Sequence, residues 1–297
     1  MSENGIENAF TIDVEDYFQV SAFENDIKRS EWDSIESRVV NNTQCILRML
    51  DKHNIKATFF ILGWVAERNK QLVMDISSEG HEIASHGYSH KLIYNQSKSE
   101  FRDETLKAKH LLEDIIQKPV NGYRAASYSI TKDSLWALDI LANAGFKYDS
   151  SIYPVVHDRY GIPDAQEMPY VINNSNGQGL IEFPLSVYKI INYNLPVSGG
   201  GYFRLYPYFF TKYALASINE CDKPFVFYLH PWEVDPGQPR IATNLISRFR
   251  HYNNLDRCEE RLNKLLNDFN FTTMINVLKN QGYEMLNIDH HACFSNS

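Results

Sequence analysis

The sequence predicts an α/β fold built on a parallel sheet, in the form of a β/α barrel. Apolar segments alternate with helix-periodic, amphipathic segments at least six times before residue 232, which is the order of strand–helix units in such folds. Polar side chains follow several of the apolar segments directly, where each expected strand ends. The chain has 297 residues, 43% of them hydrophobic and 22% charged, so it can bury a large core.

The first quarter of the chain predicts two strand–helix units and the start of a third. The apolar segment AFTIDV at 9–14 indicates a buried strand, and the segment at 37–53 has helical periodicity. The run KATFFILG at 56–63 predicts a second strand. A helix is expected at 64–78, before a glycine turn and the strand-like segment HEIASH at 81–86.

The next segments continue this alternation. Residues 97–117 predict a long, charged amphipathic helix, and NGYRAASYS at 121–129 predicts a strand. The helix expected at 132–144 ends before Gly145, because glycine commonly follows a helix C-terminus. Residues 147–153 predict another strand.

Turn chemistry interrupts the pattern beyond residue 156. The motifs GIPD and NNSNG indicate an irregular stretch at 157–179. The apolar runs at 180–190 and 224–232 predict two more strands. Between them, a loop containing three glycines leads to a helix at 208–219.

The end of the chain predicts an extension packed on the same body. We expect residues 1–236 to form the barrel and residues 237–297 to form this C-terminal extension. It contains a charged helix at 255–269, a second helix at 272–281 and a last strand at 283–289.

Charge and composition exclude several classes of protein. The formal net charge of −8 argues against a general nucleic-acid binder. The N-terminus has no basic region followed by an apolar core, and no apolar run approaches the roughly 20 residues of a membrane span. The four cysteines form no CxxC motif and suit reduced thiols. We therefore expect a cytoplasmic protein without a transmembrane segment; its oligomeric state cannot be predicted from the sequence.

Polar residues gather at the carboxyl ends of five expected strands. In β/α barrels the functional face is built at these ends. The residues concerned are Asp13, Glu15, Asp16, His86, His90, Arg124, Asp149 and His230.

The motif SHGYSH could bind a metal. His86 and His90 are four residues apart, so their rings meet on one face if the chain turns helically between them. Two imidazoles at that spacing suit a divalent ion, most often zinc. The alternative is a surface turn without function, but carboxylates on a neighbouring strand end could complete a metal shell.

The acidic motif TIDVED could supply those carboxylates. Asp13 and Glu15 project to the same side of a strand. Three acids in four residues repel one another unless a positive charge is near, and either a metal or Arg124 could provide it. The alternative is an acidic turn that caps a helix, which would explain Asp16. His230 follows an apolar strand and is either a core residue or a general acid.

The motifs TIDVED, ATFFILG, SHGYSH, GYRAAS and LHPW, in this order, resemble those of the polysaccharide deacetylases of carbohydrate esterase family four, the NodB-homology fold. The longer segments TIDVEDYFQV, GYRAASYSI, YDSSIYP, HDRYGIP, GGGYFR and LHPWEVDP look like the subgroup associated with exopolysaccharide gene clusters and the exosortase system. The resemblance covers about Ala9 to Pro236.

This resemblance implies a distorted β/α barrel of about seven strands that binds one divalent metal, with zinc expected and cobalt or manganese as alternatives. His86 and His90 would be ligands, and Asp13 would be the catalytic base. Strand geometry favours Glu15 as the third ligand; in the other reading Asp16 binds the metal and Glu15 is the base.

The resemblance also implies the reaction, which is removal of N-acetyl groups from an N-acetylated oligosaccharide, polysaccharide or precursor. Arg124 would orient the base and His230 would be the general acid. A backbone N–H near Tyr128 would stabilise the oxyanion, and Tyr153 could wall the acetyl pocket. Trp232 is a candidate for stacking on sugar, with packing in the core or a loop as the alternative.

The sequence departs from the family pattern at two places. Ala126 stands where the family usually has proline, and Ile152 and Tyr153 stand where it has an Asp-Trp pair that steadies the histidine. The partner of His230 must therefore come from elsewhere, with Asp149 and Glu182 as candidates. Arg204, in the glycine-rich loop, could meet an acidic sugar.

Two other functions stay open: a hydrolase of another linear amide, like allantoinase, and an inactive carbohydrate-binding or assembly protein.

Overall fold

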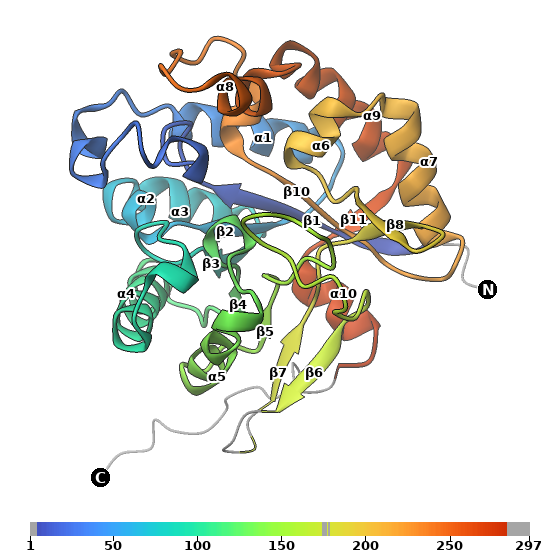
Figure 1. Ribbon diagram of the computed structural model, residues 1–297, viewed down its shortest axis with the longest axis horizontal. Coiled ribbons are helices and arrows are strands. Elements are labelled where there is room, and N and C mark those ends of the chain that lie inside the picture. Colours follow the sequence, from blue (N-terminus) through green and yellow to red (C-terminus); the bar gives the residue numbers. More distant parts are fainter. Residues whose placement is uncertain (1–4, 174–176, 178, 284–297) are drawn as a thin grey trace.

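The computed structural model describes residues 5–173, 177 and 179–283, and its centre is a sheet surrounded by helices (Figure 1). In this described part, the sheet has nine strands, seven of which form a parallel path in the order β10-β1-β2-β3-β4-β5-β7. The prediction of an α/β fold with about seven barrel strands agrees with this parallel path. The nine strands are β1 (Glu7–Val14), β2 (Thr58–Ile61), β3 (Glu82–Ser85), β4 (Gly122–Tyr123), β5 (Tyr148–Asp149), β6 (Tyr170–Asn173), β7 (Gly179–Glu182), β10 (Val226–Leu229) and β11 (Asn270–Thr272).

Strand β1 is buried from its second residue onward, as expected for a parallel strand covered on both faces. The sheet register aligns the carboxyl ends of its neighbours. Val14 pairs with Ile61, Ile61 with Ser85, and Ser85 with Tyr123. On the other side, Ile12 pairs with Leu229. The residues that follow these strands therefore emerge at one edge of the sheet.

Long periodic segments form the helices that the sequence predicts. The expected helices at 37–53, 97–117 and 208–219 are α1 (Val39–Lys52), α4 (Lys98–Ile116) and α7 (Tyr208–Asn219). The helix expected at 132–144 is α5 (Trp136–Asn143), preceded by a 3-10 turn, and Gly145 follows it with a φ of 83°. The prediction of one helix at 64–78 is wrong, because Asn69 has non-helical dihedral angles of −131° and 52°. The chain there forms α2 (Gly63–Arg68) and α3 (Lys70–Ser78).

The segment from 157 to 207 is more ordered than the sequence predicts. Strand β6 lies within the stretch expected to be irregular and pairs antiparallel with β7. The expected strand at 180–190 is two strands, β7 and β8 (Val187–Ile190), separated at Pro184, which has no N–H to donate to a ladder. The expected loop contains β9 (Tyr193–Pro196), which pairs with β8 as a hairpin, and α6 (Gly200–Leu205).

The tail contributes to the same sheet. The predicted helices at 255–269 and 272–281 are α9 (Cys258–Asp268) and α10 (Met274–Asn280); α8 (Leu245–Tyr252) and β11 were not predicted. Strand β11 pairs parallel with the start of β1, from Glu7 to Ala9. The strand expected at 283–289 lies outside the described residues, except for Tyr283, and the boundary at 236/237 stays a prediction. None of the helices in the described ranges has the length and apolar character to cross a bilayer.

Candidate active site

Glu15, His86 and His90 meet at the carboxyl edge of the sheet. One ligand atom from each lies within 4.8 Å of the others, and all three residues are buried. Glu15 follows β1 and His86 follows β3, so the register of the sheet brings them level. The two rings meet, with centroids 5.4 Å apart, but without the helical turn that the sequence analysis assumed. The chain bends instead through Gly87 and His90, with φ values of 72° and 52°.

The chemistry of these three side chains fits a divalent cation. Nδ1 of His86 donates to the carbonyl oxygen of Arg124 at 2.9 Å, which leaves the Nε2 lone pair free. Burial lowers the pKa of His86 to about 4, so the ring is neutral at pH 7. Oε2 of Glu15 lies 2.7 Å from Nε2 of His90, yet it is buried and accepts no hydrogen bond among the described residues. Two imidazoles and an unsatisfied carboxylate oxygen are donors of the kind that zinc binds.

The charge of Glu15 is also favoured electrostatically. Burial by itself would raise the pKa of Glu15, but the neighbouring imidazoles of His90, His230 and His86 lower it to about 2. The group is therefore a carboxylate over the whole neutral range, as a metal ligand must be.

Asp16 is not part of this group. Its Oδ2 accepts hydrogen bonds from Ser37 Oγ at 2.6 Å and from the backbone N–H groups of Arg38 and Val39. These groups lie at the N-terminus of α1, where an acidic side chain satisfies free N–H donors. The reading in which Asp16 binds the metal and Glu15 is the base thus finds no support in the geometry, and the capping alternative describes Asp16 well.

Asp13 is held by two donors. Oδ1 of Asp13 forms a 2.7 Å ion pair with Arg124, and Oδ2 accepts from the Tyr128 hydroxyl at 3.3 Å. Arg124 is fully buried, and it also donates to Thr11 Oγ1 and to Ser150. Arg124 can therefore orient Asp13, as the resemblance implied. The backbone N–H of Tyr128 is used by the Ala125 carbonyl, so the expected oxyanion donor is already engaged.

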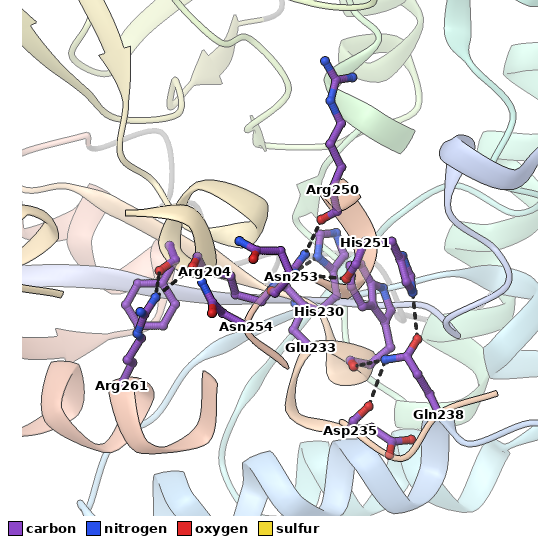
Figure 2. Close-up of polar contacts among 12 residues, drawn as sticks. Arg204, His230, Glu233, Asp235, Gln238, Arg250, His251, Asn253, Asn254 and Arg261 are labelled. Atoms are coloured by element: carbon purple, nitrogen blue, oxygen red, sulfur yellow. Dashed lines mark hydrogen bonds and ion pairs between the residues drawn. The ribbon is translucent and has the colours of Figure 1, made fainter. Parts of the chain in front are cut away.

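His230 lies opposite, and its partner is neither of the two acids expected. Nδ1 of His230 is 2.8 Å from Oε1 of Glu233, which lies next to it in Figure 2. Nε2 of the same ring lies 3.6 Å from Oε1 of Glu15. Asp149 and Glu182 pair with each other across β5 and β7 instead. Glu233 stands three residues after His230 in LHPWE, in the capping-box position of a 3-10 turn, and that spacing is the signal that could have revealed it.

The surroundings keep His230 protonated. Burial opposes the charged ring, but the hydrogen bond to Glu233 and the charges of Glu15 and Glu233 raise the pKa of His230 to about 9. A cation bound beside Glu15 would lower this value, since like charges repel. The protonated ring is the form that a general acid needs.

The expected aromatic contacts differ in part. Tyr153 is fully buried, with its ring 5.7 Å from that of Tyr128, so it lies in the aromatic wall next to the site. Trp232 is only 5% exposed: its ring stacks between His230 and His251, and its Nε1 donates to Glu15 at 3.3 Å. Trp232 thus supports the site from within and presents no open face to a sugar.

Arg204 is buried as well. It is 1% exposed and forms an ion pair with Glu233, from Nε to Oε2, of 2.6 Å. The expectation that Arg204 could meet an acidic sugar is therefore wrong, because its guanidinium is already paired inside the protein.

Two protein families match parts of this chain. Residues 31–148 match the polysaccharide deacetylase family. Residues 150–279 match a second family, which is described as a domain of unknown function (DUF3473). The chain is therefore similar to polysaccharide deacetylases over residues 31–148, and over residues 150–279 to a family whose description gives no activity.

Curated relatives share parts of this chain. A peptidoglycan-N-acetylglucosamine deacetylase of Bacillus cereus is 41% identical over 70 residues, which are 24% of this chain and 26% of that protein. A chitooligosaccharide deacetylase of Bradyrhizobium sp. is 28% identical over 102 residues, which are 34% of this chain and 44% of the relative. The chain thus spans less than half of the length of the curated relatives it matches.

Solved structures show the fold over the whole chain. A Mycobacterium smegmatis protein assigned to the polysaccharide deacetylases superposes with a TM-score of 0.63 at 17% identity, covering 100% of this chain and 96% of the other. Puue allantoinase superposes with a TM-score of 0.62 at 15% identity, covering 99% and 94%. At these identities the similarity establishes the fold and does not distinguish the two activities.

Proposed function

We propose that this protein is a metal-dependent hydrolase that removes N-acetyl groups from an N-acetylated sugar of a bacterial polysaccharide or its precursor. One observation carries the proposal: Glu15, His86 and His90 meet at the same sheet edge as the Asp13–Arg124 pair and His230. A metal-ligand set, a held carboxylate base and a protonated imidazole are the groups that amide hydrolysis requires. The deacetylase match over residues 31–148 supports the choice of substrate class.

Glu15, His86 and His90 would hold the metal. A divalent cation bound there would polarise the amide carbonyl and make a water molecule nucleophilic at neutral pH. Zinc suits the two imidazoles and one carboxylate best, with cobalt or manganese as alternatives.

Asp13 would accept the proton of the attacking water. Its ion pair with Arg124 and its hydrogen bond from Tyr128 fix the carboxylate in one orientation. Burial raises the pKa of the Tyr128 hydroxyl well above its usual value, so this hydroxyl remains a donor. An orienting pair of this kind favours proton transfer because the base need not reorganise during reaction.

His230 would donate a proton to the leaving amine. Its Nε2 is directed to the side of Glu15, while Nδ1 is engaged by Glu233. The two proton-transfer groups thus belong to two neighbouring strand ends, with Asp13 near the end of β1 and His230 directly after β10. The named substrates of the relatives, peptidoglycan N-acetylglucosamine and chitooligosaccharide, support an N-acetylated sugar as the substrate here. An exopolysaccharide or its precursor is the finer proposal.

The test is acetate release from N-acetylated chitooligosaccharides, measured together with metal content. We expect one equivalent of zinc, loss of acetate release on chelation, and recovery with zinc or cobalt. His86→Ala should lose both the metal and activity, while His110→Ala, which changes an exposed histidine of α4, should keep both. Hydrolysis of allantoin without acetate release would favour the allantoinase-like alternative. A stoichiometric metal without turnover of either substrate would overturn the proposed activity.

A further inference from the structure

Behind His230 lies a buried ion pair that the proposed reaction does not itself use. Oε1 of Glu233 contacts both the backbone N–H and Nδ1 of His230, at 3.1 and 2.8 Å. Oε2 of the same carboxylate accepts from Nε of Arg204 at 2.6 Å (Figure 2). The side chains of Glu233 and Arg204 are 0% and 1% exposed. Each carboxylate oxygen therefore has a separate task, one toward the imidazole and one toward the guanidinium.

The guanidinium of Arg204 is fixed in turn by the end of helix α8. Its Nη atoms donate to the backbone carbonyls of Arg250, His251 and Asn253, at 3.0, 2.8 and 2.7 Å. The last carbonyls of a helix have no partner within the helix and carry partial negative charge. Arg204 satisfies them, so the position of the guanidinium depends on where α8 ends.

Stability alone gives no reason for this arrangement. Removing two charges from water costs several kcal/mol per ion, and a buried pair often does no more than offset that cost. The charges of Arg204 and His230 oppose the effect of burial and hold the pKa of Glu233 at about 2, so the carboxylate stays ionised. An ionised, oriented carboxylate at Nδ1 is the usual device for fixing the direction of a catalytic imidazole.

We propose that Glu233 and Arg204 are positioning residues for His230: Glu233 holds Nδ1–H of the ring so that Nε2 faces the reacting atoms, and the end of α8 fixes Arg204 against Glu233. The proposal rests on the proposed function for the role of Nε2. Glu233 would then be the partner of His230, in place of the Asp of the Asp-Trp pair that this sequence lacks at Ile152 and Tyr153.

A stack of aromatic rings beside this network also connects α8 to His230. The ring of His251, also in α8, lies 4.1 Å from that of Trp232, which lies 5.1 Å from the ring of His230. His251 is itself held through Nε2 by Gln238 at 2.7 Å. Helix α8 therefore supports His230 by two routes, one ionic and one through stacked rings. Arg204, His230, Glu233 and α8 all lie within 150–279, so the region described as having unknown function would complete the deacetylase site.

The experiment compares Glu233→Gln, Arg204→Met and a matched control, Arg261→Ala. Arg261 is a suitable control because it also donates to backbone carbonyls, in its case those of Phe203, Arg204 and Tyr206 in and just after α6. No contact among the described residues joins Arg261 to Glu233. The readouts are kcat and KM for acetate release, zinc content, and the proton resonance of the His230 Nδ1–H in protein labelled with ¹⁵N-histidine, recorded without metal.

We expect Glu233→Gln to lower kcat about 100-fold, within the range for loss of general acid catalysis, with KM and zinc content little changed. The downfield Nδ1–H signal should disappear in Glu233→Gln and weaken in Arg204→Met. Arg261→Ala should retain both kcat and the signal. If Glu233→Gln fails to fold, Arg204→Lys, which keeps the charge but loses the multiple donors, should weaken the signal in its place.

Two results would overturn the proposal. The first is an unchanged Nδ1–H signal and kcat in Glu233→Gln, or in Arg204→Lys where it stands in. The second is an equal loss of kcat in Arg261→Ala and Arg204→Met. That result would mean that Arg204 only holds α6 in place and does not position His230. If the wild-type protein releases no acetate, the proposed function fails. The Nδ1–H resonance of His230 still shows in that case whether Glu233 and Arg204 hold the ring.

Discussion

At the scale of single residues, the carboxylate of Asp13 is the group on which proton removal from water depends in the proposed reaction. Asp13→Asn keeps the shape of the side chain and removes the base. We expect kcat to fall about 10²- to 10⁴-fold, the usual contribution of a general base. Zinc content should stay at one equivalent, because Asp13 is not one of the three proposed ligands, Glu15, His86 and His90. The measurement is steady-state acetate release with metal analysis on the same sample.

Thr58→Ser is a suitable control for Asp13→Asn, since it is a mild change in a buried side chain that contacts Glu82 on the neighbouring strand and none of the proposed catalytic groups. It should leave kcat close to the wild-type value. Full activity in Asp13→Asn would mean that another group accepts the proton. Loss of zinc in the same variant would mean that Asp13 belongs to the metal shell.

Residues that directly follow a strand were predictable, and those that act through distant contacts were not. Asp13, Glu15, His86, Arg124 and His230 each stand one to three residues from the end of an apolar run, so their shared edge follows from the parallel sheet. Arg204 could not be placed in this way. Its role depends on a side chain 29 positions away and on backbone carbonyls still further along the chain.

At the scale of elements, predictability followed length and periodicity. Helix α4, with 19 residues, has an amphipathic pattern long enough to identify, whereas β4 and β5 have two residues each and were expected to be several times longer. Beyond β4 the chain enters a 3-10 turn in which Ser127 and Tyr128 have left-handed φ values of 50° and 54°. That backbone conformation places the Tyr128 hydroxyl against Asp13, and no propensity argument would have predicted it.

The N-terminus of α4 offers a prediction for an element outside the site. Ser97 caps this helix: its Oγ accepts from the Glu100 N–H, and its own N–H donates to the Glu100 carboxylate. Ser97→Ala should lower the free energy of unfolding by about 1 kcal/mol, the typical cost of losing such a cap. Chemical denaturation measures this change, and acetate release should be unaffected. Ser99→Ala, in the same turn, is the control. An equal loss of unfolding free energy in that variant would show that the effect does not come from the cap at Ser97.

At the scale of the whole molecule, the candidate site combines three stretches of chain. Asp13 and Glu15 precede both matched regions, His86 and Arg124 belong to residues 31–148, and His230 belongs to residues 150–279. Strands from all three stretches pair in one sheet, since β1 lies between β2 and β10. The site therefore depends on strand pairing across the whole sheet, and neither matched region holds all of its side chains.

The stability of the whole fold should depend on pH through His81, which lies away from the site. Nδ1 of His81 accepts the Ala57 N–H at 3.1 Å, so the buried ring must be neutral there. Burial, with the nearby charge of Lys56, lowers the pKa of His81 to about 4. In the unfolded chain the ring takes up a proton near its ordinary pKa of about 6.5. Between these values the unfolded state binds more protons than the folded state, so stability is retained above pH 6.5 and falls as the pH drops toward 4.

We expect this histidine to remove about 2 kcal/mol from the free energy of unfolding between pH 6.5 and pH 4, after allowance for solvent screening. His81→Asn retains an acceptor for the Ala57 N–H but cannot take up the proton. The variant should therefore be less stable than the wild type at pH 7, because it packs less well, and its stability should fall less steeply with acid. Urea titrations at several pH values measure both slopes. A ring that stays neutral in the folded state must make the free energy of unfolding fall with acid. If the free energy of unfolding depends on pH equally in both proteins, His81 does not act in this way and other groups cause the acid sensitivity.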